Sequence, residues 1–213
     1  MRLILIGVEY AGKTTLANAM HDWGLSVGKK FHMDDGDFTI PDYHHLSPED
    51  QETMWNMSPV LKERFQRMVL YYHLEILERY DDCVFGGFHI EEKIYGPRYY
   101  HPDSEVTYHR WLEHKMPSNC ILVNMVCEPD VIRQRMKDDP HPYQLVQPGE
   151  VEELQEEFLH EYNHSYFRRK LEFDTTNLTP ETILDTFLDR VRPVLTARDL
   201  VFLDSVRTPG SPV

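Results

Sequence analysis

A nine-residue stretch near the start of the chain, GVEYAGKTT, constrains the fold more than any other feature of the sequence. It runs from Gly7 to Thr15 and fits the pattern G-x-x-x-x-G-K-[ST], in which the backbone N–H groups of a glycine-rich loop surround phosphate groups. Such a loop lies between a buried parallel strand and a helix. The apolar run at residues 3–6 and the helical spacing of apolar residues at 16–23 supply both neighbours. We therefore expect a strand, a phosphate-binding loop and a helix at the start of an α/β domain.

The loop pattern assigns a ligand and a role to its residues. Lys13 is expected to reach the β- and γ-phosphates of a nucleoside triphosphate, and Thr14 to hold Mg²⁺ through its hydroxyl. Thr15 is expected to cap the helix or to contact the α-phosphate. ATP and Mg²⁺ are thus the expected cofactors. The full set of nucleotide-binding residues expected in the loop is Gly7, Glu9, Tyr10, Ala11, Gly12, Lys13, Thr14 and Thr15.

Beyond the loop, short apolar runs alternate with helical patterns, which is typical of a parallel sheet covered on both faces. Further strands are predicted at residues 29–35, 83–89, 119–127 and 170–176, and helices at about 60–79, 129–139, 150–168 and 179–195, the last with Thr179 as its N-cap. The pattern predicts a three-layer P-loop NTPase fold with a five-stranded parallel sheet. We expect residues 1–197 to form a single domain and residues 198–213 a C-terminal tail with a flexible end.

The net charge and the lengths of the apolar stretches limit the binding partners that the protein can have. The 22 Lys and Arg residues against 36 Asp and Glu residues give a formal net charge of −14, which argues against broad binding to nucleic acid or to an anionic membrane. No stretch approaches the length of apolar chain that spans a bilayer, so we expect a cytoplasmic protein with a small-molecule substrate. Cys83, Cys120 and Cys127 lie in apolar runs and are expected to be buried, reduced thiols. The oligomeric state stays open, with a homodimer as one alternative.

Further segments give the chain a resemblance to a known family. The order of elements, with EPDVIRQRMKDD after the fourth strand, resembles the thymidylate kinase-like branch of the nucleoside monophosphate kinases. FHIEEKIYGPRYY is similar to the segment after that family's third strand, and LEFDTTNLTPETI to its last strand and helix. The resemblance covers about residues 1–195. It implies an enzyme, a P-loop kinase that moves the γ-phosphoryl group of ATP to a nucleoside or nucleotide, with a deoxypyrimidine monophosphate as the leading acceptor.

The resemblance also implies a lid at about residues 133–149. Arg133 and Arg135 lie where such an arm would begin and are expected to clamp the transferring group, and Arg133 and Lys137 to contact the nucleotide. A closed lid excludes water and brings positive charge to a metaphosphate-like transition state. A solvated basic helix face is the alternative interpretation.

One departure from the family pattern concerns the end of the third strand. Family members have Asp-Arg before an aromatic residue, with the Asp near Mg²⁺ or the acceptor and the Arg on the acceptor's phosphate, whereas this chain has Gly86 and Gly87 before Phe88. We expect the missing carboxylate to come from Asp34 and Asp35, at the end of the second strand, where it would act in catalysis. Surface residues of a turn are the alternative interpretation.

The acceptor pocket is expected to combine the region after the third strand with the helix at 60–79. Glu92 matches the family's glutamate and is expected to bind the sugar or base of the acceptor, with plain packing as the alternative. Arg64 and Arg67 share a helix face and are expected to hold an acceptor phosphate, with a solvent-facing role as the alternative. The full set of expected acceptor-binding residues is Asp34, Arg64, Arg67, Phe88, His89, Glu92 and Tyr95.

Two other functions stay open. The first is a kinase for a hydroxyl on a modified nucleoside, free or within DNA, although the net charge argues against the polymer. The second is a nucleotide-binding switch or regulatory protein with slow or no hydrolysis. The N-K-x-D and D-x-x-G patterns of switch GTPases do not occur in the sequence. A kinase also needs a second pocket, for which the 36–59 loop, the aromatic-rich 88–111 segment and the lid provide material.

Overall fold

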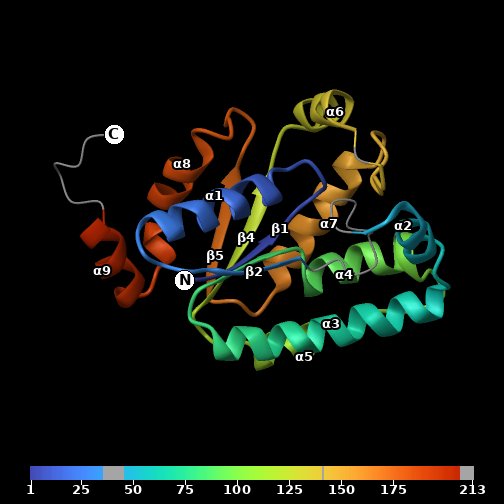
Figure 1. Ribbon diagram of the computed structural model, residues 1–213, viewed down its shortest axis with the longest axis horizontal. Helices are drawn as coiled ribbons and strands as arrows, with labels where there is room; N and C mark the ends of the chain where they lie inside the picture. The colour runs from blue at the N-terminus through green and yellow to red at the C-terminus, as the bar shows by residue number, and fades with distance from the viewer. Residues whose placement is uncertain (36–45, 141, 207–213) are drawn as a thin grey trace.

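Five parallel strands form the centre of the molecule, in the order β2-β3-β1-β4-β5 (Figure 1). The computed structural model describes residues 1–35, 46–140 and 142–206, except for the side chains of Asp34 and Asp35. The strands are β1 (Arg2–Ile6), β2 (His32–Asp35), β3 (Cys83–Gly86), β4 (Cys120–Val126) and β5 (Arg169–Asp174). All four neighbouring pairs are parallel, so the predicted α/β sheet is confirmed.

Helices follow the strands in the alternation that the sequence predicts. In the described part of the chain they are α1 (Lys13–Ser26), α2 (Pro48–Trp55), α3 (Pro59–Arg79), α4 (His89–Tyr95), α5 (His109–Lys115), α6 (Pro129–Asp138), α7 (Val151–His164), α8 (Ile183–Arg190) and α9 (Ala197–Val206). A π-helix (Gly96–Tyr100) follows α4, and a short 3-10 helix (Arg192–Val194) follows α8. None of these described helices is both long enough and apolar enough to span a bilayer.

The apolar side chains of the central strand pack on both faces of the sheet. Leu3 and Leu5 of β1 belong to a cluster with residues of α1, α8 and α9, whereas Ile4 and Ile6 belong to a cluster with residues of α3, α4, α5 and α7. Figure 1 shows the helices lying in these two layers. A strand that is buried on both faces reads as a continuous apolar run, which is why β1 was recognisable from its sequence.

Several boundaries differ from the sequence prediction. The third strand ends at Gly86 because Gly87 (φ 81°) and Phe88 (φ 108°) turn the chain directly into α4. Helix α7 ends at His164 instead of residue 168, and α8 begins at Ile183 with Thr182, not Thr179, as its N-cap. Residues 198–206 of the expected tail are helical in α9, while residues 207–213, where a flexible end was predicted, lie outside the described residues. The three cysteines are buried, as predicted.

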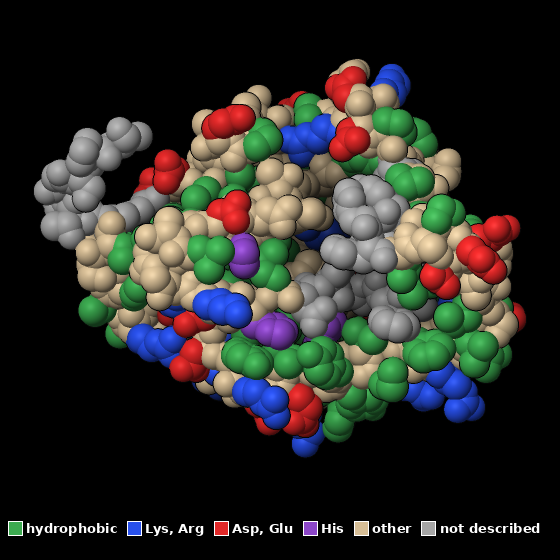
Figure 2. Space-filling model, in the orientation of Figure 1, with side chains coloured by type: hydrophobic (Ala, Val, Ile, Leu, Met, Phe, Trp, Pro, Cys, Tyr) green, Lys and Arg blue, Asp and Glu red, His purple; other side chains and the backbone are tan. Residues whose placement is uncertain are grey.

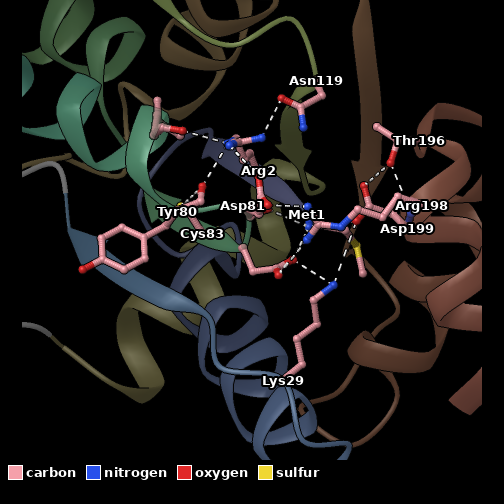
Figure 3. A network of polar contacts seen from close by, with 12 residues as sticks. Met1, Arg2, Lys29, Tyr80, Asp81, Cys83, Asn119, Thr196, Arg198 and Asp199 are labelled. Atoms are coloured by element: carbon pink, nitrogen blue, oxygen red, sulfur yellow. Dashed lines mark hydrogen bonds and ion pairs between the residues drawn. The ribbon is translucent and has the colours of Figure 1, made fainter.

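A polar network fastens α9 to the amino-terminal end of the sheet (Figure 3). The α-amino group of Met1 donates to the carbonyl oxygen of Asp81 (3.1 Å) and to the Asp199 carboxylate (3.0 Å), and it also pairs with Asp82. Lys29 lies 2.8 Å from Asp82. The network is at the opposite end of β1 from the phosphate-binding loop, so its role is to stabilise the fold.

Asp199→Asn is expected to lower the free energy of unfolding by about 1–3 kcal/mol at neutral pH, because the buried ammonium of Met1 loses a charged partner. Burial by itself would raise the pKa of Asp199, but Met1, Thr196 and Lys29 outweigh it and hold this pKa below its ordinary value. A carboxyl group with a lowered pKa in the folded state stabilises fully above its unfolded pKa, about 3.9, and the stabilisation is lost as the pH falls below that value.

Urea denaturation of a chain that begins at Met1, repeated across this pH range, measures the effect. The difference between wild type and Asp199→Asn should be largest near neutral pH and should shrink in acid. Asp204→Asn is the matched control, because Asp204 pairs with Arg192 at an exposed site and such pairs contribute little. A difference that stayed constant down to the lowest pH would contradict the assignment.

Candidate active site

The phosphate-binding loop connects β1 to α1 and has the backbone conformation that its glycines permit. Gly7 has φ 139° and Gly12 has φ 94°, values that other residues rarely adopt. A Cβ at Gly7 would also collide with the carbonyl oxygen of Met125 in β4. Lys13 and the exposed Thr14 open α1, so its first N–H groups and its positive end face the same space as the loop. The loop therefore has the backbone conformation expected of a phosphate-binding loop, and the binding of an anion there stays a prediction.

The ammonium group of Lys13 lies inside this loop. It donates to the carbonyl oxygen of Gly7 and lies 3.4 Å from that of Val8. It also forms an ion pair of 3.3 Å with the carboxylate of Glu91, from the first turn of α4. Sequence reasoning missed Glu91, although its place four residues after Gly87 puts it at the carboxyl end of the neighbouring strand.

Arg135 contacts the loop from α6. Its guanidinium donates to the carbonyl oxygens of Tyr10 (2.9 Å) and Thr175 (2.8 Å). The Thr175 hydroxyl donates in turn to the carbonyl oxygen of Ala11 (2.8 Å). Arg135 thus lies between the phosphate-binding loop and the segment after β5, close to where a bound triphosphate would lie.

Arg133 points away from the loop, because residues two apart on a helix are separated by about 200° around its axis. Its guanidinium pairs with Asp130 (2.9 Å) and with Glu152, and its Nε donates to the carbonyl oxygen of Pro148 (2.9 Å). Lys137 is exposed. Of the three basic residues expected in the lid, the structure brings only Arg135 to the loop, and the other two match the solvated-face interpretation in this arrangement.

The second half of the expected lid is anchored to the loop. The N–H groups of Leu145 and Val146 donate to the Glu9 carboxylate (3.2 and 3.0 Å), and both apolar side chains are buried. Burial raises the pKa of Glu9, the positive charge of Lys13 acts against that rise, and the nearby charge of Glu91 adds to it. The prediction of a flexible arm is therefore corrected at 145–146, where two apolar residues enter the core; residue 141 lies outside the described residues.

Two tyrosines complete the contacts of the loop. Tyr10, with φ 64°, donates its hydroxyl to the side-chain oxygen of Gln144 (3.2 Å). Tyr95, at the end of α4, accepts the N–H of Glu9 with its hydroxyl oxygen (3.2 Å). Tyr95 is completely buried and packs edge-on against Phe158. It was expected to line the acceptor pocket, whereas here it supports the loop.

Glu92 lies in a second group of buried polar residues. Its carboxylate is 2.6 Å from Nε2 of His101 and accepts a hydrogen bond from the side-chain amide of Gln66 on α3 (3.3 Å). Burial raises the pKa of Glu92, although His101 and Gln66 act in the opposite direction. Glu92 and Glu91 are adjacent in α4, so this group and the Lys13 pair lie at the same edge of the sheet.

His89 and Phe88 do not line an open pocket, which corrects the sequence prediction. His89 is fully buried, pairs with Glu113 of α5 (3.0 Å) and stacks on Phe167. Burial lowers the pKa of His89, although Glu113 acts in the opposite direction. Phe88 is 1% exposed and packs against Phe85. The turn after β3 makes His89 the first residue of α4, where its ring fills the space beside α5 instead of facing the loop.

Helix α3 presents a different face to the site than predicted. Arg64 is exposed, and Arg67 is partly exposed and pairs with Glu63 (3.3 Å). The buried polar residues of α3 are Lys62, Gln66 and His73, of which the first two are one turn apart. Burial lowers the pKa of Lys62. Gln66 was not expected as a site residue, and only its contact with α4 distinguishes it from other helix residues.

Asp34 and Asp35 end β2 as predicted. Their backbones are aligned with Phe85 and Gly86 of β3, at the carboxyl edge of the sheet. Their side chains lie outside those that the structure describes, so a catalytic role for Asp34 and Asp35 stays a prediction.

Figure 2 shows the face drawn in Figure 1 hollowed near its centre, with Lys or Arg side chains inside the hollow. Within the described ranges no group of three or more His, Cys, Asp or Glu side chains is placed to hold a metal ion. The exposed Thr14 hydroxyl nevertheless fits Mg²⁺ bound with a nucleotide, because this ion keeps several waters and takes few protein ligands besides phosphate oxygens.

Solved structures share this architecture, and two of the three reported below are named as kinases. The YorR protein of Bacillus subtilis, in complex with phosphorylated GDP, is 16% identical, with a TM-score of 0.57 over 100% of both chains. Shikimate kinase from Bacteroides thetaiotaomicron is 18% identical, with a TM-score of 0.54 over 91% of this chain and 97% of that one. Deoxyadenosine kinase from M. mycoides with bound dATP is 13% identical, with a TM-score of 0.53 over 90% and 100%.

The chain therefore has the P-loop NTPase fold, in the form found in small kinases. At these identities the likeness establishes the fold alone. No protein-family model matches the sequence, and no curated protein matches it.

Proposed function

We propose that this protein is a P-loop kinase that transfers the γ-phosphoryl group of ATP to a nucleoside or nucleotide. The observation that carries the proposal is the pairing of two sites at one edge of the sheet. The phosphate-binding loop holds Lys13, and a second group of buried polar residues, Gln66, Glu92 and His101, lies beside it. A nucleotide switch needs only the first site, whereas a kinase needs both.

In this proposal, the loop residues and the residues that contact the loop each have a separate task. Lys13 neutralises the β- and γ-phosphates, and Arg135 stabilises the charge that spreads over the transferring group. Thr14 would hold Mg²⁺, which supplies further neutralisation of phosphate charge when it is bound. Glu9 and Tyr10 hold residues 144–146 against the loop, so that water is excluded from one side of the nucleotide.

Two acceptors follow from different observations. The family resemblance favours a deoxypyrimidine monophosphate. The charges beside the loop favour an acceptor hydroxyl on a nucleoside, because Gly87 stands where family members carry an arginine for the acceptor's phosphate, and the buried carboxylate of Glu91 lies against this glycine. A dianionic phosphate would be repelled there, whereas a neutral hydroxyl would not.

A panel assay tests the function. Purified protein is incubated with Mg·ATP and, one at a time, with nucleosides, hydroxyl-modified nucleosides, their monophosphates and an acceptor outside this class such as shikimate. Phosphorylated acceptor is detected by mass spectrometry, and ADP is measured in parallel. We expect phosphorylation of at least one nucleoside or nucleotide. ADP release without any phosphorylated acceptor would instead indicate a nucleotide-hydrolysing switch.

A further inference from the structure

The turn after β3 brings one carboxylate into the phosphate site. Gly87 has φ 81°, and Phe88, which is not a glycine, has φ 108° and ψ −148°, a conformation that costs energy and is concentrated at functional sites. A Cβ at Gly87 would lie 3.1 Å from the carboxyl carbon of Glu91. The carboxylate of Glu91 thus lies tightly against the space of a side chain at position 87, and this contact together with the positive φ favours a glycine there.

The carboxylate of Glu91 is buried, and burying a charged group is energetically unfavourable. Glu91 is 3% exposed, and its Oε2 atom accepts no hydrogen bond from any residue in the described part of the chain. Its cationic neighbour is Lys13, at 3.3 Å, and the carboxylate of Glu9 is close enough to be affected by its charge. A second anion in a site built for phosphate weakens ground-state binding, so its presence calls for a role that appears during the reaction.

Glu91 lies close to where the transferring phosphoryl group would bind. Lys13 is the residue that contacts the β- and γ-phosphates in such loops. A phosphate oxygen bound to its ammonium would lie no more than about 6 Å from Oε2 of Glu91, two hydrogen-bond lengths, so a hydroxyl that attacks this phosphoryl group comes within reach of the carboxylate. Oε2 of Glu91 is the oxygen that faces the Lys13 ammonium at 3.3 Å, and because it accepts no hydrogen bond in the described part of the chain it can take the proton of that hydroxyl.

We propose that Glu91 is the catalytic base of a hydroxyl kinase. The acceptor's hydroxyl oxygen forms a bond to the γ-phosphorus of the nucleoside triphosphate, and the bond from that phosphorus to the β,γ-bridging oxygen breaks. The hydroxyl proton passes to Oε2 of Glu91, and the nucleoside diphosphate leaves with the electron pair. Protonation neutralises Glu91 as the reaction proceeds and relieves its repulsion with the phosphates.

This inference rests on the proposed kinase function and narrows its acceptor. A monophosphate presents an oxygen that is already ionised and needs no base, whereas a hydroxyl must lose its proton. Glu91 therefore assigns the acceptor to the class of nucleosides that react through a hydroxyl.

Glu91→Gln, which keeps the shape of the side chain and removes its charge, is the test. With the best acceptor from the panel, kcat should fall at least about 10²-fold, the lower end of what a positioned base contributes. The apparent KM for ATP should not rise, because a repulsive charge near the phosphates is removed. The acidic limb of the pH profile of kcat should disappear. Glu113→Gln is the matched control, since Glu113 is a buried, His-paired carboxylate of α5, and its folded fraction should keep the wild-type rate.

Other outcomes distinguish a failure of the Glu91 assignment from a failure of the proposed kinase function. A variant with wild-type kcat, or with unchanged kcat and a raised KM for ATP, would overturn the inference and leave Glu91 as a support for Lys13. A rate loss confined to Asp34→Asn or Asp35→Asn would do the same. If Glu91→Gln does not fold, Glu91→Asp decides: a lower rate with retained ATP binding supports the proposal, and the wild-type rate overturns it. A wild-type protein that phosphorylates no acceptor would overturn both.

Discussion

Lys13→Ala is expected to lower kcat at least about 10³-fold, the largest effect of any single substitution in this chain, because a fixed cation at the transferring phosphoryl group is lost. The lysine ammonium lies inside the loop, in contact with the Gly7 carbonyl and 3.3 Å from Glu91. The conformation of the loop depends on its glycines and not on this side chain, so the variant should fold. Phosphorylation of the panel's best acceptor and nucleotide titration measure the loss.

The control for Lys13→Ala must separate chemistry from stability. Removing Lys13 leaves the Glu91 carboxylate buried without its cation, which costs stability. The double variant Lys13→Ala/Glu91→Gln should therefore recover thermal stability without recovering activity. Lys30→Ala, at an exposed position near β2, should keep the wild-type rate. Wild-type turnover by Lys13→Ala would show that the loop does not serve phosphoryl transfer.

Arg135→Ala is expected to lower kcat by on the order of 10² to 10³ and to change the apparent ATP affinity much less, if its guanidinium acts on charge that develops in the transition state. The structure places this side chain at the loop, where it binds the Tyr10 carbonyl at 2.9 Å and the Thr175 carbonyl at 2.8 Å. Steady-state kinetics at varied ATP, with single-turnover rates, measures the two effects separately.

Arg133→Ala, measured beside Arg135→Ala, tests the placement of the two arginines. Arg133 is paired with Asp130 and Glu152 on the other side of α6, so its loss should be clearly smaller. Arg79→Ala, exposed at the end of α3, is the control for loss of a surface arginine. A raised KM for ATP with unchanged kcat in Arg135→Ala would show that Arg135 only supports the loop.

Local sequence was sufficient for the fold class and for the place and backbone conformation of the loop between β1 and α1. Gly7 and Gly12 need positive φ, Lys13 follows them at a fixed spacing, and apolar runs flank them, all within one short segment. Such signals depend on neighbours in the chain, so they can be read without knowing any distant contact. The alternation of strands and helices is local in the same sense, which is why the five-stranded sheet was predictable.

The sequence determined only in part which side of α6 faces the loop. Arg133 and Arg135 are two residues apart and must lie on opposite sides of α6, a consequence of helical geometry that the sequence contains. Which of these sides meets the loop depends on how α6 packs, with Ile132 and Met136 in the core. Likewise, Leu145 and Val146 lie in a polar, proline-containing stretch, and tertiary contacts fix them, namely their packing in the core and their hydrogen bonds to Glu9, more than 130 residues away.

The identity of the carboxylate beside Lys13 was decided by tertiary structure alone. Glu91 is 78 residues from Lys13 along the chain, and the two meet because β3 pairs with β1 and the N–H of Gly87 donates to the Leu5 carbonyl (2.8 Å). The turn at Gly87 and Phe88 then directs the first turn of α4 toward the loop. No periodicity or motif encodes such a meeting, because it results from strand pairing, one strained turn and helix packing acting together.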